Sequence, residues 1–464
     1  MTSHWRWHAF RTSLVVCAAS LISAAEGNSY RCGPTRQGVR LPNCSSCLSG
    51  RADPHKECDS QDCAYWKEQC RPRQEPWGGP SDFPLPPDVR PRECRRLATD
   101  WKEEDFSDHK VSVVIPWLNE TWEHLEGTLR SLVYFTPDEL IAEYLFVSDG
   151  NVDAKEKELQ AISPKVKVMA LQQRQGLIRA KQWGVDEAKG PVIMFLEAHC
   201  IVNKDWLQPL LQRVKANPRV LAMPSLDVIP PREWHRYKKA APGHWRYEWN
   251  CNVIYTNPGH LKDMDYQPHP SPGTSGGIFA IRKDWFQDME LFDPGLEEWG
   301  GDHFEISMKV WRCGGRIETV PCARVGHLFR EPTLRPYDVQ VPQVVRNYKR
   351  LAMVWIKDHI DIFYRMKSDC LDMVIEDVED IRKRYDSLVD KLQCKNMSWY
   401  LENVDFELRW EMNRTCVPNL DRRLFPDLAC PGRAVAGRAT VDEIMPMHTF
   451  LEWRSGAGLD GAGS

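Results

Sequence analysis

The sequence predicts an α/β fold in which a mostly parallel, twisted sheet is flanked by helices. Apolar runs of strand length alternate with segments of helical spacing between residues 111 and 196. Helical connections of this kind place successive strands side by side and parallel, with a right-handed crossover. The composition agrees, because 42% hydrophobic and 27% charged residues in a 464-residue chain are typical of a folded globular protein.

Each expected strand is a run of β-branched and other apolar residues, and each expected helix repeats apolar residues every three or four positions. The strands are predicted at 111–116, 144–147, 166–171 and 192–196, and the helices between them at 122–133, 155–161 and 177–188. After about residue 220 the pattern is mixed, with an aromatic-rich region and a glycine segment. Further helices are expected at 303–313, 342–359 and 373–392.

The charge balance excludes one broad class of partner. Lys and Arg number 61 against 65 Asp and Glu, so the formal charge is −4. No overall positive field favours nucleic acid or an acidic membrane surface. We therefore expect no nucleic-acid partner, and any polyanion must bind at a local site.

The N-terminus has the order of a secretory signal peptide. Arg6 and Arg11 precede an apolar stretch at 14–25 that ends in small residues. Roughly twelve residues form a helix of about 18 Å, short of the ~30 Å hydrocarbon core. We expect a signal peptide at 1–25, with an unusually short anchor as the alternative and as the only route to a membrane.

Residues 26–95 read as a Cys- and Pro-rich stem. Seven of the 16 cysteines lie between Cys32 and Cys94, and in an oxidising lumen they form disulfides. Zinc is the alternative, because Cys44 and Cys47 have ligand spacing, but no second pair follows at a finger-like interval. Sequons at Asn119 and three other positions permit N-glycosylation in that compartment.

Ligands of such sheets bind beyond the carboxyl ends of the strands, so the residues there are the first candidates for a site. Glu197 and His199 follow the strand at 192–196 and, two apart in extended backbone, point to the same side. A carboxylate and an imidazole suit manganese or zinc better than calcium. His327 follows another strand as a candidate third ligand, and Arg330 could meet a phosphate. The alternative is that no metal binds: Glu197 is an ordinary loop carboxylate, His199 is hydrogen-bonded within the protein, and His327 faces the core at a strand edge.

Two other strand ends carry groups that suit an anionic or nucleotide ligand. Gly176 opens a helix and Arg179 lies one turn into it, an arrangement suited to an anion, although Arg179 fits a solvated helix position equally well. Asp149 could accept hydrogen bonds from a ribose or a uracil N–H, but Asp-Gly is also a routine turn.

A third group suits a sugar. Gly276 and Gly277 allow bare backbone to lie against a ligand, while Trp299 and Asp302 supply an aromatic plane and a carboxylate. Asp302 could instead be a simple helix cap.

Together these segments resemble the polypeptide N-acetylgalactosaminyltransferases over about residues 89–400. The motifs that carry the resemblance are Asn119-Glu120, Gly176-Leu177-Ile178-Arg179-Ala180, Ala198-His199-Cys200, Gly276-Gly277-Ile278-Phe279, Trp299-Gly300-Gly301 with Glu305-Ile306-Ser307, Val325-Gly326-His327 with Phe329-Arg330, and Lys391-Leu392-Gln393-Cys394 with Ser398-Trp399-Tyr400. The resemblance implies a GT-A type nucleotide-sugar transferase fold, UDP-GalNAc as donor, a Ser/Thr-containing polypeptide as acceptor, and residence in the Golgi lumen or secretion.

The resemblance also implies roles for particular residues. Metal ligands for Mn²⁺ are Glu197, His199 and His327; catalytic residues are Asp302, Arg330 and Trp299; substrate-binding residues are Asn119, Glu120, Asp149, Gly176, Arg179, Gly276 and Gly277. It further implies disulfides from Cys94 to Cys322 and from Cys313 to Cys394.

The chain departs from the family pattern at three places. Glu197 stands where the family has Asp, Asp302-His303 where it has Glu-Asn, and Leu118 where a His is usual. These changes leave two alternatives open: another UDP-sugar donor, or a catalytically silent relative that binds UDP or peptide. The catalytic domain is expected at 96–404, and the tail at 405–464 is too short for the family's lectin trefoil.

Overall fold

The computed structural model describes residues 86–412, except for 232, 235, 242, 262–264 and 331–334. The expected signal peptide, nearly all of the stem and nearly all of the tail lie outside the described residues. The domain boundaries therefore stay predictions. Within the described part, no helix combines the length and apolar character needed to cross a membrane.

The first half of the sheet is parallel, as the alternating pattern predicts. Its strands run in the spatial order β3-β2-β1-β4, each parallel to its neighbour. The strands are β1 (Val111–Trp117), β2 (Ile141–Asp149), β3 (Val166–Leu171) and β4 (Val192–Phe195), and the connecting helices are α4 (Trp122–Phe135), α5 (Glu156–Ile162) and α6 (Leu177–Glu187). The predicted ranges match these elements to within a few residues.

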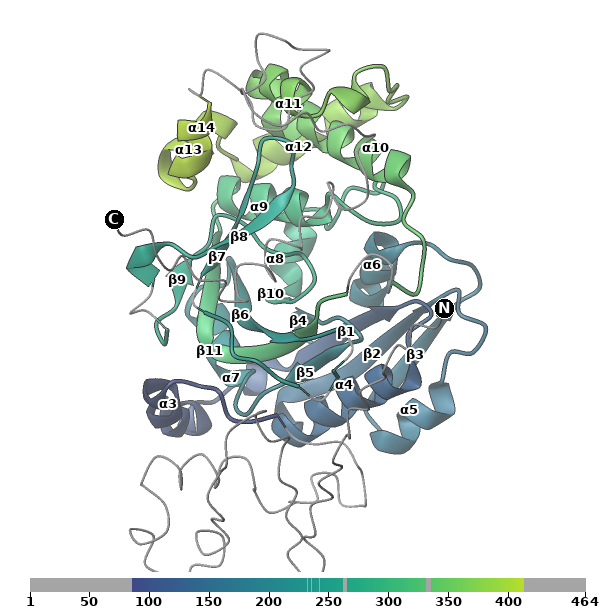
Figure 1. Cartoon of the computed structure of the whole chain (residues 1–464), viewed down its shortest axis with the longest axis vertical. Helices are drawn as coiled ribbons and strands as arrows, with labels where there is room; N and C mark the ends of the chain where they lie inside the picture. Colours follow the sequence, from purple (N-terminus) through teal and green to yellow (C-terminus); the bar gives the residue numbers. More distant parts are fainter. Residues whose placement is uncertain are drawn as a thin grey trace, which may run out of the picture. The chain divides into compact units, whose positions relative to one another are not determined.

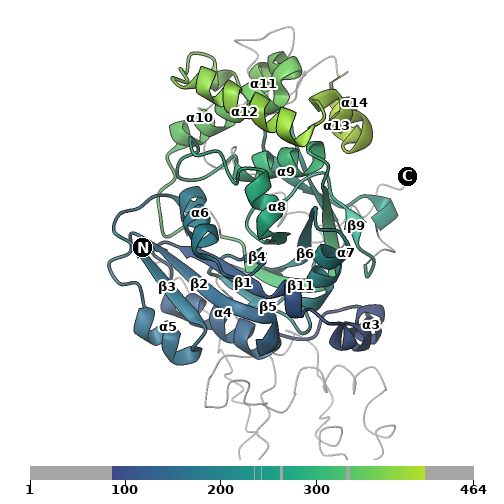
Figure 2. The same cartoon turned by 180° about the vertical axis from the view of Figure 1, so that it is seen from behind.

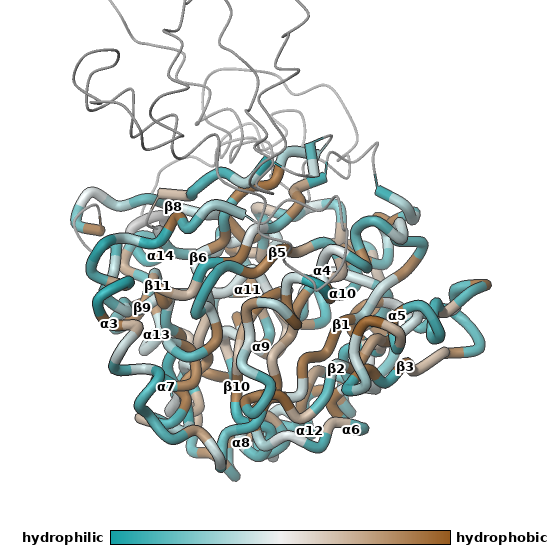
Figure 3. Tube along the Cα trace, turned by 90° about the horizontal axis from the view of Figure 1, so that it is seen from below, coloured by the Kyte–Doolittle hydropathy of each residue, from teal (hydrophilic) through white to brown (hydrophobic). Residues whose placement is uncertain are grey.

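Helices cover both faces of this half. Val114 of β1 packs in the core on the side of α6, whereas Val113 and Ile115 pack in the core on the side of α4. Because both faces are buried, the strand shows no polar alternation and all seven of its residues are buried. Figure 3 shows the consequence as hydrophobic segments through β1 and β10, with hydrophilic ones along the outer loops.

The second half of the sheet is mixed, which qualifies the expectation of a mostly parallel sheet. Strand β10 (Phe279–Arg282) lies antiparallel between β4 and β6 (Val220–Ile229). The chain returns from β6 through the hairpin β7 (His244–Tyr247) and β8 (Val253–Thr256) and the short β9 (His269–Pro270), not through a crossover helix. A parallel neighbour would need a crossover connection. Without one, β10 begins at the end of the sheet where β6 ends and runs antiparallel to it.

The long strand β11 (Arg316–Leu328) completes the sheet. It runs parallel to β6 and antiparallel to β5 (Cys200–Val202). The remaining helices are α3 (Arg92–Glu103), α7 (Gln208–Ala216), α8 (Lys283–Asp288), α9 (Asp302–Arg312), α10 (Val341–Leu351), α11 (Ile360–Met366), α12 (Val378–Leu392), α13 (Met397–Asn403) and α14 (Phe406–Glu411). Figures 1 and 2 show α10 to α14 gathered at one end of the described part, with α4 and α5 at the other.

Two predicted helices differ from the structure. Where one helix is expected at 342–359, the α-helix ends at Leu351. A π turn over Ala352–Ile356 and a 3₁₀ turn over Lys357–His359 follow it. The helix expected at 373–392 begins only at Val378. Apolar spacing continues through both segments, so periodicity alone does not locate these boundaries.

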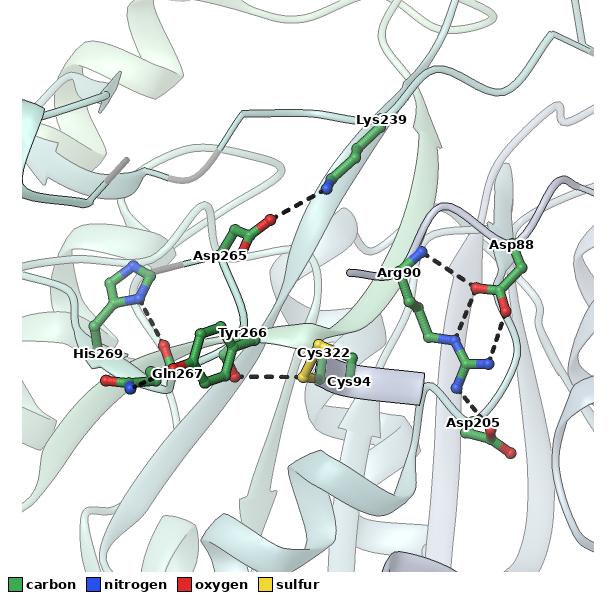
Figure 4. The surroundings of a disulfide bond; sticks show 10 residues. All are labelled: Asp88, Arg90, Cys94, Asp205, Lys239, Asp265, Tyr266, Gln267, His269 and Cys322. Carbon is green, nitrogen blue, oxygen red and sulfur yellow. Dashed lines mark hydrogen bonds and ion pairs between the residues drawn. A yellow bond between two sulfur atoms is a disulfide. The ribbon is translucent and has the colours of Figure 1, made fainter. Parts of the chain in front are cut away.

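Both implied disulfides are confirmed. Cys94 of α3 is bonded to Cys322 of β11, and Cys313 is bonded to Cys394. Figure 4 shows the Cys94–Cys322 disulfide. It also shows an ion pair of Arg90 with Asp205, at 2.6 Å, which links the segment before α3 to the loop after β5; Arg90 is paired with Asp88 as well. The segment that precedes the sheet is thus fixed to it both covalently and electrostatically.

Candidate metal centre

Strand pairing brings three candidate ligands to one edge of the sheet. Glu197 and His199 follow β4, and His327 lies near the end of β11. In the antiparallel pair of β11 with β5, His327 stands opposite Cys200, the neighbour of His199. The backbone N–H of Leu328 also donates to the carbonyl of His199, 3.2 Å away.

The three side chains converge on one point. Potential ligand atoms of Glu197, His199 and His327 all lie within 4.8 Å of one another. Nε2 of His199 is 3.0 Å from Glu197 Oε2, and Nε2 of His327 is 2.7 Å from the same oxygen. The structure therefore assembles the trio expected from the sequence, while its role as a set of metal ligands stays a prediction.

The arrangement fits a divalent cation. Ligand atoms about 2.1 Å from an ion occupy neighbouring positions about 3 Å apart, close to the two distances found here. His327 faces Glu197 through Nε2, while its buried Nδ1 has no hydrogen-bond partner among the described residues. In His199 the Nδ1 lies 3.0 Å from Glu120 Oε2, so a carboxylate behind the ring fixes the tautomer that presents Nε2 as a ligand.

Glycine 277 makes room for the longer carboxylate of Glu197. A Cβ at this position would stand 2.0 Å from Glu197 Oε1. The bare backbone at Gly277 therefore lies against a protein carboxylate, and its expected contact with a ligand stays a prediction. Glu197, one methylene longer than Asp, still reaches the two histidines because that space is open.

Glu120 organises the other side of the centre. Its carboxylate contacts His199, His124 at 2.7 Å, and the guanidinium of Arg330. Burial raises the pKa of Glu120, but these partners outweigh it and hold that pKa well below its usual range. Burial likewise opposes ionisation of Glu197, and the neighbouring His327 and His199 hold its pKa well below the usual value. Both carboxylates are therefore anionic at neutral pH.

The imidazoles respond to burial and to these anions in opposite ways. Burial lowers the pKa of His327 more than Glu197 raises it. For His199, hydrogen bonds to Glu120 and Glu197 outweigh burial and raise the pKa.

A cavity of about 220 Å³ opens on the three side chains. Besides the trio, four of the residues to which the resemblance gives a role line it: Glu120, Asp149, Trp299 and Arg330. Its wall also contains aromatic side chains that sequence analysis did not assign to the site, among them Tyr255, Tyr337 and Tyr348. Three potential metal ligands, a cationic side chain and an aromatic wall are thus combined in one cavity.

Asp149 lines the cavity but is also engaged with backbone. Its two carboxylate oxygens accept the N–H groups of Gln175 and Gly176, at 2.6 and 2.9 Å. Gly176 has φ +88°, and a Cβ there would stand 2.3 Å from the backbone of Glu298. Asp149 and Gly176 therefore fix the start of α6 beside the cavity.

The other expected residues are absent from the part of the cavity wall that the structure describes. Asp302 is buried and paired with Lys181 at 2.7 Å, and Lys181 also donates to the carbonyl of Gly276 at 2.9 Å. Arg179 turns to Glu297, 3.4 Å away, and exposed Asn119 donates to the carbonyl of Pro336. Their expected roles in catalysis and substrate binding stay predictions.

Two side chains that hold the site together, Lys181 and His124, are not among the residues expected from the sequence. Lys181 lies one turn after Ile178 on the buried face of α6, and a cation on an apolar face is a signal for a buried partner. His124 follows Glu120 by four residues and forms an i,i+4 pair with it. Of the pair Asp302-His303, which departs from the family pattern, His303 lines the cavity and Asp302 does not.

Comparison with known proteins agrees with this fold. Residues 112–290 match the model of glycosyl transferase family 2, and residues 261–332 match that of the N-terminal domain of galactosyltransferase. The solved structure of GalNAc-T7 with UDP, GalNAc and Mn²⁺ superposes with a TM-score of 0.61 at 25% identity, covering 73% of this chain and 70% of that one. Fold and family models together define a glycosyltransferase of GT-A type.

Similar proteins show to which family of glycosyltransferases the chain belongs. Human polypeptide N-acetylgalactosaminyltransferase 10 is 36% identical over 307 residues, 64% of this chain and 50% of the relative. The inactive polypeptide N-acetylgalactosaminyltransferase-like protein 5 of Macaca fascicularis is 33% identical over 318 residues, 66% of this chain and 70% of the relative. The chain belongs to the polypeptide N-acetylgalactosaminyltransferase family. It spans about half the length of curated relatives such as the human protein.

Proposed function

We propose that this protein transfers GalNAc from UDP-GalNAc to Ser or Thr hydroxyls of polypeptides, with Mn²⁺ as cofactor. The observation that carries the proposal is the convergence of Glu197, His199 and His327 in a cavity at the carboxyl ends of the strands. A donor set of one carboxylate and two imidazoles suits manganese. A bound cation there would neutralise the diphosphate leaving group as the bond to the sugar breaks.

The protein's own side chains would do the rest. Arg330 lines the cavity and uses Nη2 toward Glu120, which leaves other N–H groups of its guanidinium for a phosphate. Trp299 offers an aromatic plane for the apolar face of a sugar. Asp149 lines the cavity and accepts the N–H groups of Gln175 and Gly176, which fixes the start of α6 beside the proposed nucleotide site.

We place this activity in the lumen of the secretory pathway. The two disulfides support an oxidising compartment, since such bonds are rare in cytosolic proteins. The apolar stretch at 14–25 is consistent with entry to that pathway.

A catalytically silent role is the second candidate. The printed name of the Macaca relative describes that protein as inactive. In this chain Asp302 is committed to Lys181, and Glu197 stands where the family has Asp. Such a protein would bind UDP or peptide without turnover. Another UDP-sugar donor remains the alternative within the enzyme class.

One assay separates these functions. Purified full-length chain is incubated with a Thr-containing peptide and UDP-GalNAc, UDP-GlcNAc, UDP-galactose or UDP-glucose, with Mn²⁺ or with EDTA. We expect UDP release and a gain in peptide mass with UDP-GalNAc and Mn²⁺ only. Modification with another donor supports a changed specificity, whereas UDP binding without turnover supports the silent role. In the silent case Glu197→Asp should raise the rate from near zero.

A further inference from the structure

The sequence Asn396-Met397-Ser398 lies at the surface of the described part. It has the pattern of an N-glycosylation acceptor, because an asparagine is followed after one non-proline residue by a serine. Asn396 is exposed and directly precedes α13, whereas Met397 is buried in the core. The methionine therefore anchors the segment, and the asparagine remains at the surface.

The amide of Asn396 is oriented so that its nitrogen is available. The backbone N–H of Trp399 donates to Oδ1 of Asn396 at a distance of 2.9 Å. A backbone N–H can only donate, so the atom that faces it is the carbonyl oxygen of the amide. Within the part of the chain that the structure describes, Nδ2 of Asn396 forms no hydrogen bond. The atom that N-glycosylation modifies is thus both exposed and unengaged.

A glycan on Nδ2 is compatible with the local structure. It replaces one hydrogen of the amide nitrogen, and Oδ1 can still accept the N–H of Trp399. Neither Asn396 nor any residue of α13 belongs to the cavity wall that the structure describes. Figures 1 and 2 show α13 beside α14 at the margin of the ribbon. The modification would therefore leave the proposed active site open.

The other acceptor sequence in the described part, Asn119-Glu120-Thr121, is less suited. Nδ2 of Asn119 donates to the carbonyl of Pro336, 3.2 Å away, and Glu120 lines the cavity. A glycan at Asn119 would stand beside the proposed metal centre. The observations therefore favour Asn396.

We propose that Asn396 is an N-glycosylation site, whose second substrate is an oligosaccharide linked to a lipid diphosphate. The asparagine nitrogen forms a bond to the anomeric carbon of the oligosaccharide and loses a proton. The bond from that carbon to the diphosphate oxygen breaks, and the lipid diphosphate leaves. A separate enzyme of the secretory pathway catalyses this step. The modification requires the secretory location proposed above but not the transferase activity.

The test maps glycans on full-length protein secreted from eukaryotic cells. Peptides are analysed by mass spectrometry before and after treatment with peptide N-glycosidase in heavy-oxygen water. We expect a glycan on the peptide that contains Asn396, and a heavy-oxygen label at that position after the treatment. Asn396→Gln should abolish the glycopeptide, and so should Ser398→Ala, whereas Ser398→Thr should retain it. Asn403→Gln, on the same helix but in no acceptor sequence, should retain it as well.

An unmodified Asn396 in secreted protein that contains the Cys94–Cys322 disulfide overturns the proposal, because such protein has passed through the oxidising compartment. Transferase activity in the same sample then shows that the proposed function stands without the glycan. If Asn396→Gln is not secreted, Ser398→Ala decides under the same criterion, since it leaves Asn396 and its contact with Trp399 in place.

Discussion

The carboxylate of Glu197 occupies the space that a side chain at Gly277 would fill. Oε1 lies 2.0 Å from an ideal Cβ built on that glycine, and Oε2 faces the two histidines. The conformation of Glu197 and the absence of a side chain at Gly277 therefore depend on each other.

Gly277→Ala should displace Glu197 and weaken Mn²⁺ binding at least tenfold, because the carboxylate cannot keep both its place and its contacts with the histidines. Gly259→Ala is the matched control, since a Cβ there meets nothing within 4 Å. Mn²⁺ titration followed by electron paramagnetic resonance measures the effect. Unchanged affinity in Gly277→Ala would show that Glu197 is not held in this way.

Glu120→Gln should also weaken Mn²⁺ binding, by about 10- to 100-fold, although Glu120 is not one of the three proposed ligands. The carboxylate behind His199 fixes the ring and increases its basicity as a ligand. Glu126→Gln, in α4 and in a partly exposed pair with Arg130, should leave metal binding unchanged. The idea fails if the two variants bind Mn²⁺ equally well.

Lys181→Met should lower the free energy of unfolding by about 3–5 kcal/mol, because it leaves the buried carboxylate of Asp302 without its cation. The double variant Lys181→Met/Asp302→Asn should recover much of this loss. Lys167→Met removes an exposed pair with Glu187 and should cause a much smaller loss. Denaturant unfolding measures all three, and equal losses in the two lysine variants would contradict the account.

Acid should destabilise the protein partly through His244. Burial, His269 and Arg246 lower the pKa of His244 to about 4, against about 6.5 in an unfolded chain. The unfolded state therefore binds a proton more tightly, and this contribution to stability is lost as pH falls from about 6.5 to 4. We expect His244→Gln to reduce the loss of unfolding free energy over this window by about 1–2 kcal/mol. The exposed His260→Gln is the control, and identical pH profiles for the two variants would count against the prediction.

The sequence predicts the parallel half of the sheet well because β1 and β4 are buried on both faces and β1 to β4 are all rich in apolar residues. The trio of Glu197, His199 and His327 could be proposed for a related reason, since each follows or ends a strand and such ends meet at one edge. The family resemblance then gave both disulfides.

Other features depend on contacts between distant segments. Strand β10 is antiparallel to its neighbours because the chain reaches it through the β7–β8 hairpin. The residues of that hairpin do not indicate in which direction the next strand of the sheet will run. Arg179 fits the pattern of an anion-binding helix start, yet its side chain turns to Glu297, 118 residues away. The sequence likewise does not show that Lys181 pairs with Asp302, or that His303 lines the cavity while Asp302 does not.

The most direct test of the account is the stoichiometry and affinity of Mn²⁺ binding to the full-length protein in the presence of UDP. We predict one site per chain, and an affinity at least tenfold lower in each of Glu197→Gln, His199→Gln and His327→Gln, with no change in His359→Gln. If all three variants bind Mn²⁺ as tightly as the wild type, these residues do not form the metal centre and the proposed transferase mechanism is wrong.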